Sequence, residues 1–449
     1  MTNKLQNSND LFRILAAAIA ALSSFAQGQV AAPVFEPLDA DGITPFAVTV
    51  TTTTPGAQIR YTLNGADPVL TDLPIVSGGT IPLNRKVTIK AKAWQGGGES
   101  PVTSSTFSVT GDIAAGEIHS LSLAWTKAVN GWGNQGNGRL GNGVTTGNAL
   151  VPVASRYSAN SSIADAIGIA AGSGHSIFLR WDPNLVGDAR SSVWGFGLNT
   201  SGQLGDNTTT SSSYAVRALK SASPNDFLIG VADVAAGVNF SAAVKTDGRV
   251  FTWGTKSNGR LGDGSTSGTR SFANPVKRGD GTFPDLTGIV SVRAGGGFAL
   301  ARTSLASPDS GRVWAWGLNS SGQLGRGNTT SLSRAMPVLL TTSPLVELTA
   351  AVDVSAGESH SAVLRWHESN PSVNGVWCFG QRSFGRLGDG YTSGTSATVS
   401  LPTRVLTAPG TPLQNIVSVA AGSAHTLALD SGDAPGSGGS STSGGYVWA

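Results

Sequence analysis

The most constraining feature of the sequence is a repeated pair of elements, a tryptophan-bearing strand that ends at a glycine and a turn that ends in Gly-x-Leu-Gly. One copy of the strand occupies residues 312–317, and its turn follows at residues 322–325. The turn recurs at residues 138–141, 202–205, 259–262, 322–325 and 385–388. Such a repeat predicts similar units that stack on one another, because one unit alone cannot bury its apolar face.

A second element precedes each strand, and it consists of a glycine, two residues, and then histidine or phenylalanine. Its six copies are Gly116/His119, Gly172/His175, Gly237/Phe240, Gly295/Phe298, Gly357/His360 and Gly422/His425. Six copies of this element and five of the turn indicate that the chain stops inside a repeat. We expect either a fragment of a longer reading frame or a ring that another chain completes.

Each repeat has the pattern of β-strands and tight turns. Residues 241–245 and 249–253 are apolar strands joined by Thr246-Asp247-Gly248, and Asp-Gly is a hairpin signal. Radial repetition of small four-stranded sheets produces a β-propeller. The sequence therefore predicts an all-β chain with a propeller, although its spacing of 57 to 64 residues exceeds the roughly 40–50 of common propeller repeats.

The combination Ala-Ala-Gly-x-x-His-Ser, Val-Trp-x-Trp-Gly and Asn-x-x-Gly-Gln-Leu-Gly resembles the regulator of chromosome condensation repeat family. The resemblance covers about residues 111–449 and implies a propeller of the seven-bladed type. In this chain the propeller is incomplete, with five whole repeats and part of a sixth. The first repeat also departs from the pattern, because residues 128–133 replace the usual first tryptophan of the strand.

The first 26 residues have the pattern of a secretory signal peptide. Lys4 and Arg13 precede or border a short apolar run at residues 14–22, and Ser24-Phe25-Ala26 offers small residues for cleavage. This run is shorter than the ~20 residues of a spanning helix, so we expect export with no membrane span after signal removal. The protein would be secreted, periplasmic or attached to the cell surface.

Residues 30–110 form a different unit with the pattern of a small β-sandwich. Strand-like segments at 47–51, 58–63, 87–94 and 106–109 alternate with turn signals. The segment 59–68, followed by 87–91, resembles the chitobiase/β-hexosaminidase C-terminal-type domain. That resemblance implies an accessory, immunoglobulin-like sandwich. Carbohydrate or cell-wall attachment through Tyr61 or Trp94 is one alternative function, and burial of both rings in the sandwich core is the other interpretation.

Hairpin insertions at one point of several repeats predict a binding side of the propeller. Two of them begin with a tryptophan after an arginine, Arg180-Trp181 and Arg365-Trp366. Tryptophan and arginine are enriched at interaction hot spots. These four residues are therefore candidates for contact with a protein partner, although the tryptophans could instead cover the edges of their own hairpins.

The arginines of the Gly-x-Leu-Gly turns, Arg139, Arg260 and Arg386, are further partner candidates because they could form a positive rim. Solvated turn residues are the plainer interpretation. The histidines share one repeat position with Phe240 and Phe298, and a metal or catalytic site cannot exchange imidazole for phenyl. We therefore assign the histidines a structural role.

Charge and cysteine content exclude other classes of function. The net charge is +3 with no basic run, so we expect no nucleic-acid binding. Cys378 is the single cysteine, so no intramolecular disulfide can form, and its strand position suggests a buried, inert thiol. No nucleophile–base pair, calcium loop or phosphate loop is present in the sequence, and we expect no catalytic, cofactor or metal site.

These observations predict an exported, non-catalytic interaction protein whose propeller presents a loop-bearing face to a protein partner. Guanine-nucleotide exchange is an alternative that the family resemblance implies. A possible polysaccharide partner belongs to the carbohydrate alternative described above.

Overall fold

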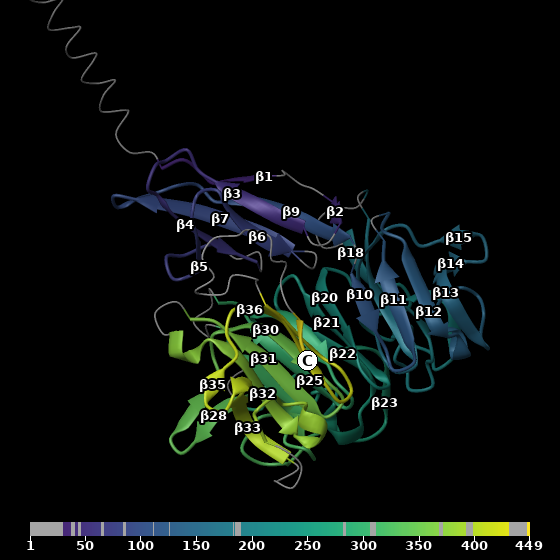
Figure 1. Ribbon diagram of the computed structural model, residues 1–449. Helices are drawn as coiled ribbons and strands as arrows, with labels where there is room; N and C mark the ends of the chain where they lie inside the picture. The colour runs from purple at the N-terminus through teal and green to yellow at the C-terminus, as the bar shows by residue number, and fades with distance from the viewer. Residues whose placement is uncertain are drawn as a thin grey trace, which may run out of the picture. The chain divides into compact units, whose positions relative to one another are not determined.

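The computed structural model describes residues 30–36, 41–43, 46–63, 67–83, 87–110, 112–124, 126–182, 184, 190–281, 284–305, 311–367, 371–391, 398–430 and 447–449 (Figure 1). The expected signal peptide, residues 1–26, lies outside the described residues. The chain divides into two compact units: the first ends at Phe107, and the second comprises residues 108–449 together with residues 41–46 and 84–86. Each unit is described by itself below.

The N-terminal part of the chain, up to residue 110, contains two β-sheets. The first sheet has the order β1 (Val34–Glu36), β3 (Phe46–Thr51), β6 (Gly79–Leu83). The second has the order β2 (Asp41–Ile43), β9 (Thr103–Thr110), β7 (Val87–Gln95), β4 (Gln58–Thr62), β5 (Leu73–Ile75), with β8 (Gly98–Glu99) also on β7.

Apolar side chains from both sheets pack on one another in this unit. Phe35 of the first sheet and Phe107 of the second are fully buried, and their rings meet edge to face with centroids 5.9 Å apart. Val48, Val50 and Ile59 are also buried. Alternating apolar residues in short strands thus produce the small sandwich that the sequence predicts.

The second unit is a β-propeller, which confirms the predicted fold class. Its described residues form five four-stranded antiparallel sheets, here called blades one to five, and a three-stranded sheet, blade six (Figure 1). The strands of blades one to three are β10 (Ile113–Ala115), β11 (His119–Leu123), β12 (Val129–Asn134), β13 (Asn148–Ala154); β16 (Ala166–Ala171), β17 (His175–Trp181), β18 (Ser191–Gly197), β19 (Ser212–Arg217); β20 (Val231–Ala236), β21 (Phe240–Lys245), β22 (Val250–Thr255), β23 (Thr269–Pro275).

The strands of blades four to six are β24 (Ile289–Ala294), β25 (Phe298–Thr303), β26 (Val313–Gly317), β27 (Leu332–Pro337); β30 (Ala351–Ala356), β31 (His360–Arg365), β32 (Gly375–Gln381), β33 (Thr398–Arg404); β36 (Ile416–Ala421), β37 (Thr426–Asp430), β38 (Val447–Trp448). Short hairpins follow three of the fourth strands: β14 (Arg156–Ser158) with β15 (Ser161–Ser162), β28 (Leu339–Thr342) with β29 (Leu345–Glu347), and β34 (Leu406–Ala408) with β35 (Thr411–Pro412).

The hairpin predicted in the third repeat is present as expected. Strands β21 and β22 pair with Val244 opposite Val250, and the Gly248 amide closes the turn on the Lys245 carbonyl at 2.9 Å. Gly248 has a φ of +81°, a conformation that glycine adopts at little cost. The Asp-Gly signal therefore marks this turn correctly.

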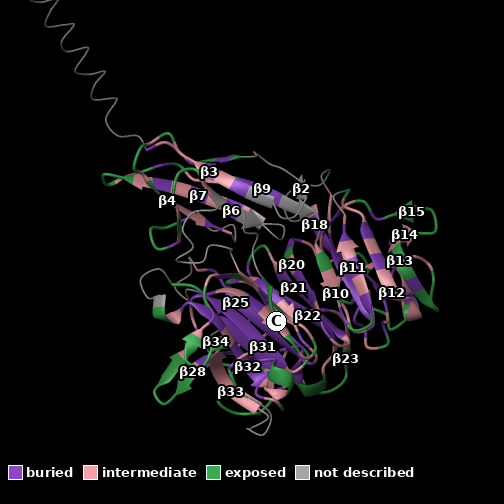
Figure 2. Cartoon of the chain, in the orientation of Figure 1, coloured by how far each residue is buried: buried purple, intermediate pink, exposed green. Residues whose placement is uncertain are grey.

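In blades two to five the second strand, counted along the chain, is a main part of the core. All six residues of β25 and all six of β31 are buried, as Figure 2 shows. Cys378 lies in the same kind of environment on β32, and burial raises the pKa of its thiol to about 12. The expected buried position of this cysteine is confirmed.

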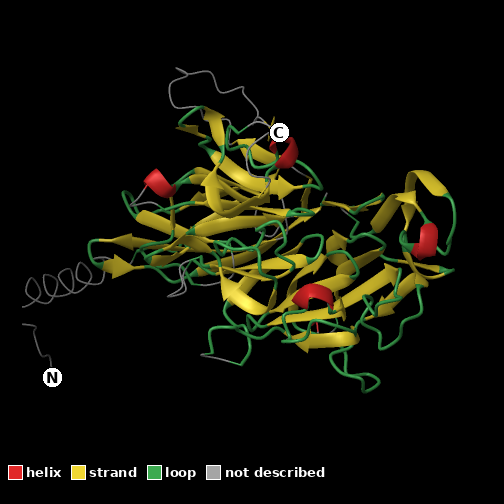
Figure 3. Ribbon diagram, turned by 90° about the horizontal axis from the view of Figure 1, so that it is seen from below, coloured by secondary structure: helices red, strands yellow, loops and turns green. Residues whose placement is uncertain are grey.

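Helical structure in the described residues is limited to short 3-10 turns, drawn red in Figure 3. No helix in the described part of the chain is long and apolar enough to cross a membrane. Three of these turns, η1 (Gly136–Gly138), η3 (Ser257–Gly259) and η5 (Ser383–Gly385), lead into the Gly-x-Leu-Gly segments.

Consecutive blades approach one another closely at the first glycine of the Gly-x-x-His/Phe element. A Cβ atom on each glycine would lie only 2.4–2.6 Å from the carbonyl oxygen of the equivalent glycine in the next blade. The successive contacts are Gly116 with Gly172, Gly172 with Gly237, Gly237 with Gly295, Gly295 with Gly357, and Gly357 with Gly422. The absence of a side chain at this position is therefore what lets the blades pack.

We predict that Gly237→Ala lowers the free energy of unfolding by about 1–3 kcal/mol, because the new methyl group overpacks the contact. It would lie 2.6 Å from the Gly295 carbonyl oxygen and 2.2 Å from the Phe240 ring. Urea denaturation measures the change. Gly168→Ala is the matched control, since its methyl group would make only an ordinary 3.7 Å contact with Leu179. Equal stability of the two variants would contradict the prediction.

Candidate functional site: blade joints and hairpin loops

The recurrent histidines lie at the interfaces between consecutive blades, which are here called joints. His119, His175 and His360 are at most 4% exposed, and the Nε2 atom of each is 2.8 Å from a hydroxyl of the following blade. These hydroxyl partners are Ser176, Ser241 and Thr426, respectively. Phe240 and Phe298 fill the same repeat position and are fully buried, whereas His425 in blade six is exposed.

Each of these hydroxyls also donates a hydrogen bond to the preceding blade. Ser176 donates to the carbonyl of Arg139, Ser241 to that of Gln203, and Thr426 to that of Arg386, each at 2.8 Å. The acceptor is always the residue x of a Gly-x-Leu-Gly turn. Since a hydroxyl has one proton and gives it to this carbonyl, the imidazole Nε2 must donate to the hydroxyl.

This hydrogen-bond arrangement keeps the joint histidines neutral. Their Nδ1 atoms are buried without a hydrogen-bond partner among the described residues, so a proton added there would create an unpaired buried charge. Burial, and secondarily nearby positive charge, lowers the pKa to about 4 for His119 and His360 and to about 3 for His175. The described residues contain no group of three side chains that could ligate a metal ion together.

The three turn arginines are also parts of the joints. Arg139, Arg260 and Arg386 are only 6–9% exposed. In each, Nε donates to the turn at 2.9 Å, and Nη1 donates to a main-chain carbonyl at 2.8–3.1 Å. That carbonyl belongs to the next blade for Arg139 and Arg386, and to the same blade for Arg260. The interpretation of these arginines as solvated turn residues is therefore wrong. Contact with a partner stays a prediction, and these bonds leave little of each guanidinium for it.

The sequence did not predict that these hydroxyls donate to the turn carbonyls, or that the turn arginines donate to main-chain carbonyls. The Nη1 acceptors are the carbonyls of Ser173, Val238 and Ser423, which lie 34, 22 and 37 residues away along the chain. The sequence does contain a signal for the hydroxyl contacts, because a serine or threonine directly follows the His/Phe position in several repeats: Ser176, Ser241, Ser361 and Thr426. Only the stacking of blades shows that these hydroxyls point across the joint.

The first candidate pair, Arg180 and Trp181, is largely engaged within its own blade and the next. Arg180 forms an ion pair with Asp165 at 2.6 Å. Trp181 is half-buried against an apolar cluster of blades two and three, and the Arg190 guanidinium lies 5.7 Å from its ring centroid. This position agrees with a tryptophan that covers its own hairpin, and a contact role for the pair stays a prediction.

The second candidate pair behaves differently, because its tryptophan faces solvent. Arg365 is 4% exposed, donates to the Thr349 carbonyl at 2.8 Å and lies 5.2 Å from the ring centroid of Trp377. Burial lowers the pKa of its guanidinium to about 10. Trp366 is 43% exposed at the start of the β31–β32 loop. Of the seven candidate residues, it presents the largest exposed aromatic surface.

The β31–β32 loop is held at its base. The His367 amide donates to the Asn374 side chain at 2.6 Å, and the Trp366 amide donates to the Ala350 carbonyl at 2.9 Å. Arg404 of the neighbouring strand β33 donates to the Ser372 carbonyl at 2.9 Å. These bonds fix the place where Trp366 leaves the blade.

The two aromatic residues considered for carbohydrate binding lie on the N-terminal sandwich and are partly buried. Burial raises the pKa of the Tyr61 phenol to about 12. The Lys92 ammonium group lies 5.4 Å from the ring centroid of Trp94. Neither ring presents a fully open stacking face.

Repeated four-stranded sheets, joined by the same set of contacts, define a propeller protein built from sequence repeats. Five stretches match the regulator of chromosome condensation (RCC1) repeat, at residues 128–179, 191–244, 247–302, 310–364 and 374–429. Together these matches cover more than half of the chain, and the protein belongs to the RCC1 repeat family. Residues 41–106 match the chitobiase/beta-hexosaminidase C-terminal domain. Both resemblances seen in the sequence are confirmed.

A known protein is similar to about half of this chain. The chain is 33% identical over 224 residues to the probable E3 ubiquitin-protein ligase HERC4 of Rattus norvegicus, a match that covers 49% of this chain and 18% of that protein. The chain thus spans less than a fifth of the length of this relative.

Solved structures agree on the fold. Human WBSCR16 superimposes with a TM-score of 0.53 and 18% identity over 83% of this chain and 99% of its own. Prp20p of Saccharomyces cerevisiae gives a TM-score of 0.51 and 15% identity over 83% and 91%. At these identities, the likeness shows the fold alone.

We predict that acid weakens the joints. A histidine whose pKa is lower in the folded than in the unfolded state adds stability above about pH 6.5, and this stability is lost as the pH falls toward the folded value. His175→Phe removes one such group, and Phe298 with Ser361 already shows a phenyl at this position with a hydroxyl at the start of the following element. Between pH 6.5 and 5 the parent should lose about 2 kcal/mol more unfolding free energy than the variant.

Urea denaturation of the parent and His175→Phe at both pH values tests this prediction. His367→Phe, in the β31–β32 loop and outside the joints, is the matched control and should follow the parent. An unchanged pH dependence in His175→Phe would show that the histidine does not sense acid in the joint.

Proposed function

We propose that this protein is a non-catalytic binding protein whose propeller presents the β31–β32 loop to a protein partner. The observation that carries the proposal is Trp366, which is 43% exposed on a loop whose base is fixed by main-chain and side-chain hydrogen bonds. A large aromatic side chain held at a defined position loses little conformational entropy on binding, which suits it to an interaction hot spot.

The use of the recurrent polar residues supports a binding role over a catalytic one. The buried histidines donate to neighbouring blades and the turn arginines donate to main-chain carbonyls, so the side chains best suited to catalysis already have structural roles. The hairpin loops are then the part of each repeat whose sequence these contacts do not constrain. Guanine-nucleotide exchange, the alternative function, rests on family membership, and the described loops add no observation in its favour.

We also propose that the protein acts after export. The support is the sequence of residues 1–26, with its positive charges, short apolar run and small residues at a cleavage point. The expected result is that protein from its native source begins near Gln27, as N-terminal sequencing and intact mass would show. An N-terminus that still carries the apolar run would contradict cleavage, and recovery from the cytoplasm alone would contradict export.

We predict that Trp366→Ala weakens binding of a partner by at least about tenfold, because it removes the exposed ring while leaving the loop base intact. Pull-down with the parent protein would identify the partner, and calorimetry would then compare the affinities. Leu345→Ala is the matched control, since Leu345 is 62% exposed on the separate hairpin β28–β29. Parent-like affinity of a folded Trp366→Ala protein would remove this loop from the binding site.

A further inference from the structure

Three blades contain a tryptophan of the third strand with two arginines beside its ring, here called arginine–tryptophan clusters. In each, both guanidinium carbons lie 4.6–6.0 Å from the ring centroid. The clusters are Arg180, Trp194 and Arg217 in blade two, Arg278, Trp314 and Arg312 in blade four, and Arg365, Trp377 and Arg404 in blade five.

Carboxylates balance the charge of the clusters in blades two and four. Each contains two arginines and two acidic residues in ion pairs with them, so its net charge is zero. A guanidinium that loses water on burial is costly without such a partner. The ion pairs are Arg180 with Asp165 at 2.6 Å and with Asp182 at 3.4 Å, Arg312 with Glu347 at 2.7 Å, and Arg278 with Asp280.

The cluster of blade five has two arginines and no carboxylate. Arg365 donates to the Thr349 carbonyl at 2.8 Å, and Arg404 donates to the carbonyls of Ser372 and Asn374. Neither arginine forms an ion pair with a described residue, so the two guanidiniums give this cluster a net charge of +2.

The repeat shows which carboxylates blade five lacks. Ala166 of β16 pairs with Arg180, as Ala351 of β30 pairs with Arg365. The residues that precede the two alanines are therefore counterparts, and so are the residues two positions after the two arginines. These counterparts are Asp165 with Ala350, and Asp182 with His367. Blade two thus shows the cluster with its carboxylates in place, and blade five shows it without them.

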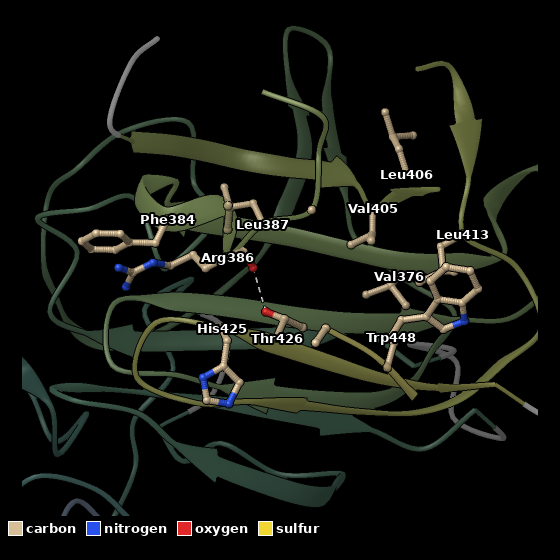
Figure 4. Close-up of a pocket in the computed structure, with 14 residues that line it drawn as sticks. Val376, Phe384, Arg386, Leu387, Val405, Leu406, Leu413, His425, Thr426 and Trp448 are labelled. Carbon is tan, nitrogen blue, oxygen red and sulfur yellow. Dashed lines mark hydrogen bonds between the residues drawn. The ribbon is translucent and has the colours of Figure 1, made fainter. Parts of the chain in front are cut away.

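Strand pairing fixes the position of Arg404 in the blade-five cluster. Arg404 lies opposite Trp377 in the β32–β33 pair. The Val405 amide donates to the Val376 carbonyl at 2.9 Å beside this pair, and Figure 4 shows both valine side chains. The main chain on both sides of the cluster is therefore held by hydrogen bonds.

The two guanidiniums retain the capacity to bind an anion. Arg404 is half-buried, and its two hydrogen bonds use two of its five N–H groups. Its Nε atom is buried without a hydrogen-bond partner among the described residues. Burial, and secondarily the positive charge of Arg404, lowers the pKa of Arg365 to about 10. A carboxylate would remove this repulsion and can accept two parallel N–H groups from one guanidinium.

We propose that the arginine–tryptophan cluster of blade five is a carboxylate-binding site for an acidic segment of a partner protein. An aspartate or glutamate of the segment pairs with Arg404, and the more buried Arg365 adds positive charge. The carboxylate takes the role that Asp165 and Asp182 have in blade two. The proposal rests on the proposed function in taking the ligand to be a protein. Its argument and its probe do not involve Trp366, so either proposal can fail without the other.

Hexaglutamate is the direct probe, and hexaglutamine is its uncharged counterpart. Calorimetry with the full chain at low ionic strength should show one hexaglutamate bound per protein. Hexaglutamine should bind at least about tenfold more weakly, because it cannot form the ion pair. Equal affinity of the two peptides, or no binding of hexaglutamate, would overturn the proposal.

Arg404→Gln tests the location, and Arg217→Gln is its matched control. Arg217 lies opposite Trp194 as Arg404 lies opposite Trp377, but in the cluster that already has carboxylates. Both variants remove one positive charge. Arg404→Gln should bind hexaglutamate at least about tenfold more weakly, whereas Arg217→Gln should bind it as the parent does. Equal losses in the two variants would indicate general attraction to a positive protein and reject the site.

His367→Asp tests the comparison between blades without removing an arginine. It introduces a carboxylate at the counterpart of Asp182, which should compete with the peptide and lower its affinity at least about tenfold. Parent-like affinity of a folded His367→Asp protein would contradict the proposed role of the carboxylate.

Acetate distinguishes a protein segment from a small free carboxylate. At the same concentration of carboxylate groups, acetate should raise the melting temperature of the parent less than hexaglutamate does, because a segment offers several carboxylates to the two arginines. An equal rise with acetate, lost in Arg404→Gln, would assign the site to small carboxylates and overturn the assignment to a protein segment.

Discussion

The structure depends on one carbonyl oxygen in each Gly-x-Leu-Gly turn. In four of the five turns the carbonyl of residue x accepts a hydroxyl of the next blade, as Gln203 does from Ser241, and in two joints it accepts an indole N–H. The glycines on either side let the neighbouring backbone and ring approach within a distance that a Cβ atom would block. Apolar packing supplies most of the free energy of such an interface, and this acceptor fixes how two blades align.

The sequence predicts the fold well because the repeat carries it. The Trp-Gly pairs at Gly254 and Gly317, near the ends of β22 and β26, and the Asp-Gly turn at Gly248 are local signals that are visible in the sequence alone. The sandwich was visible for the same reason, through alternating residues such as Ile59 in β4. Local pattern is enough where each element fixes its own conformation.

The candidate site was less predictable, because its residues are defined by neighbours that are distant along the chain. From the sequence, Arg260 is expected to be an exposed turn residue, yet only 9% of its surface is exposed in the structure. Trp181 and Trp366 look equivalent in the sequence, but one is half-buried against the next blade and the other faces solvent. No local pattern distinguishes the two, since the difference lies in what packs above each ring.

The joints have a consequence for how the propeller loses structure. Each joint uses residues from two consecutive blades, so the cooperativity of unfolding is set by nearest neighbours, as in a linear repeat array. The joint between blades three and four has Phe240 where three of the other joints have histidine, and Ala299 where all the others have a hydroxyl. Its hydrogen bonds to the turn are correspondingly fewer, while Trp316 still donates to the Arg260 carbonyl. Amide exchange could therefore divide the propeller into two groups of three blades, with the boundary at this joint.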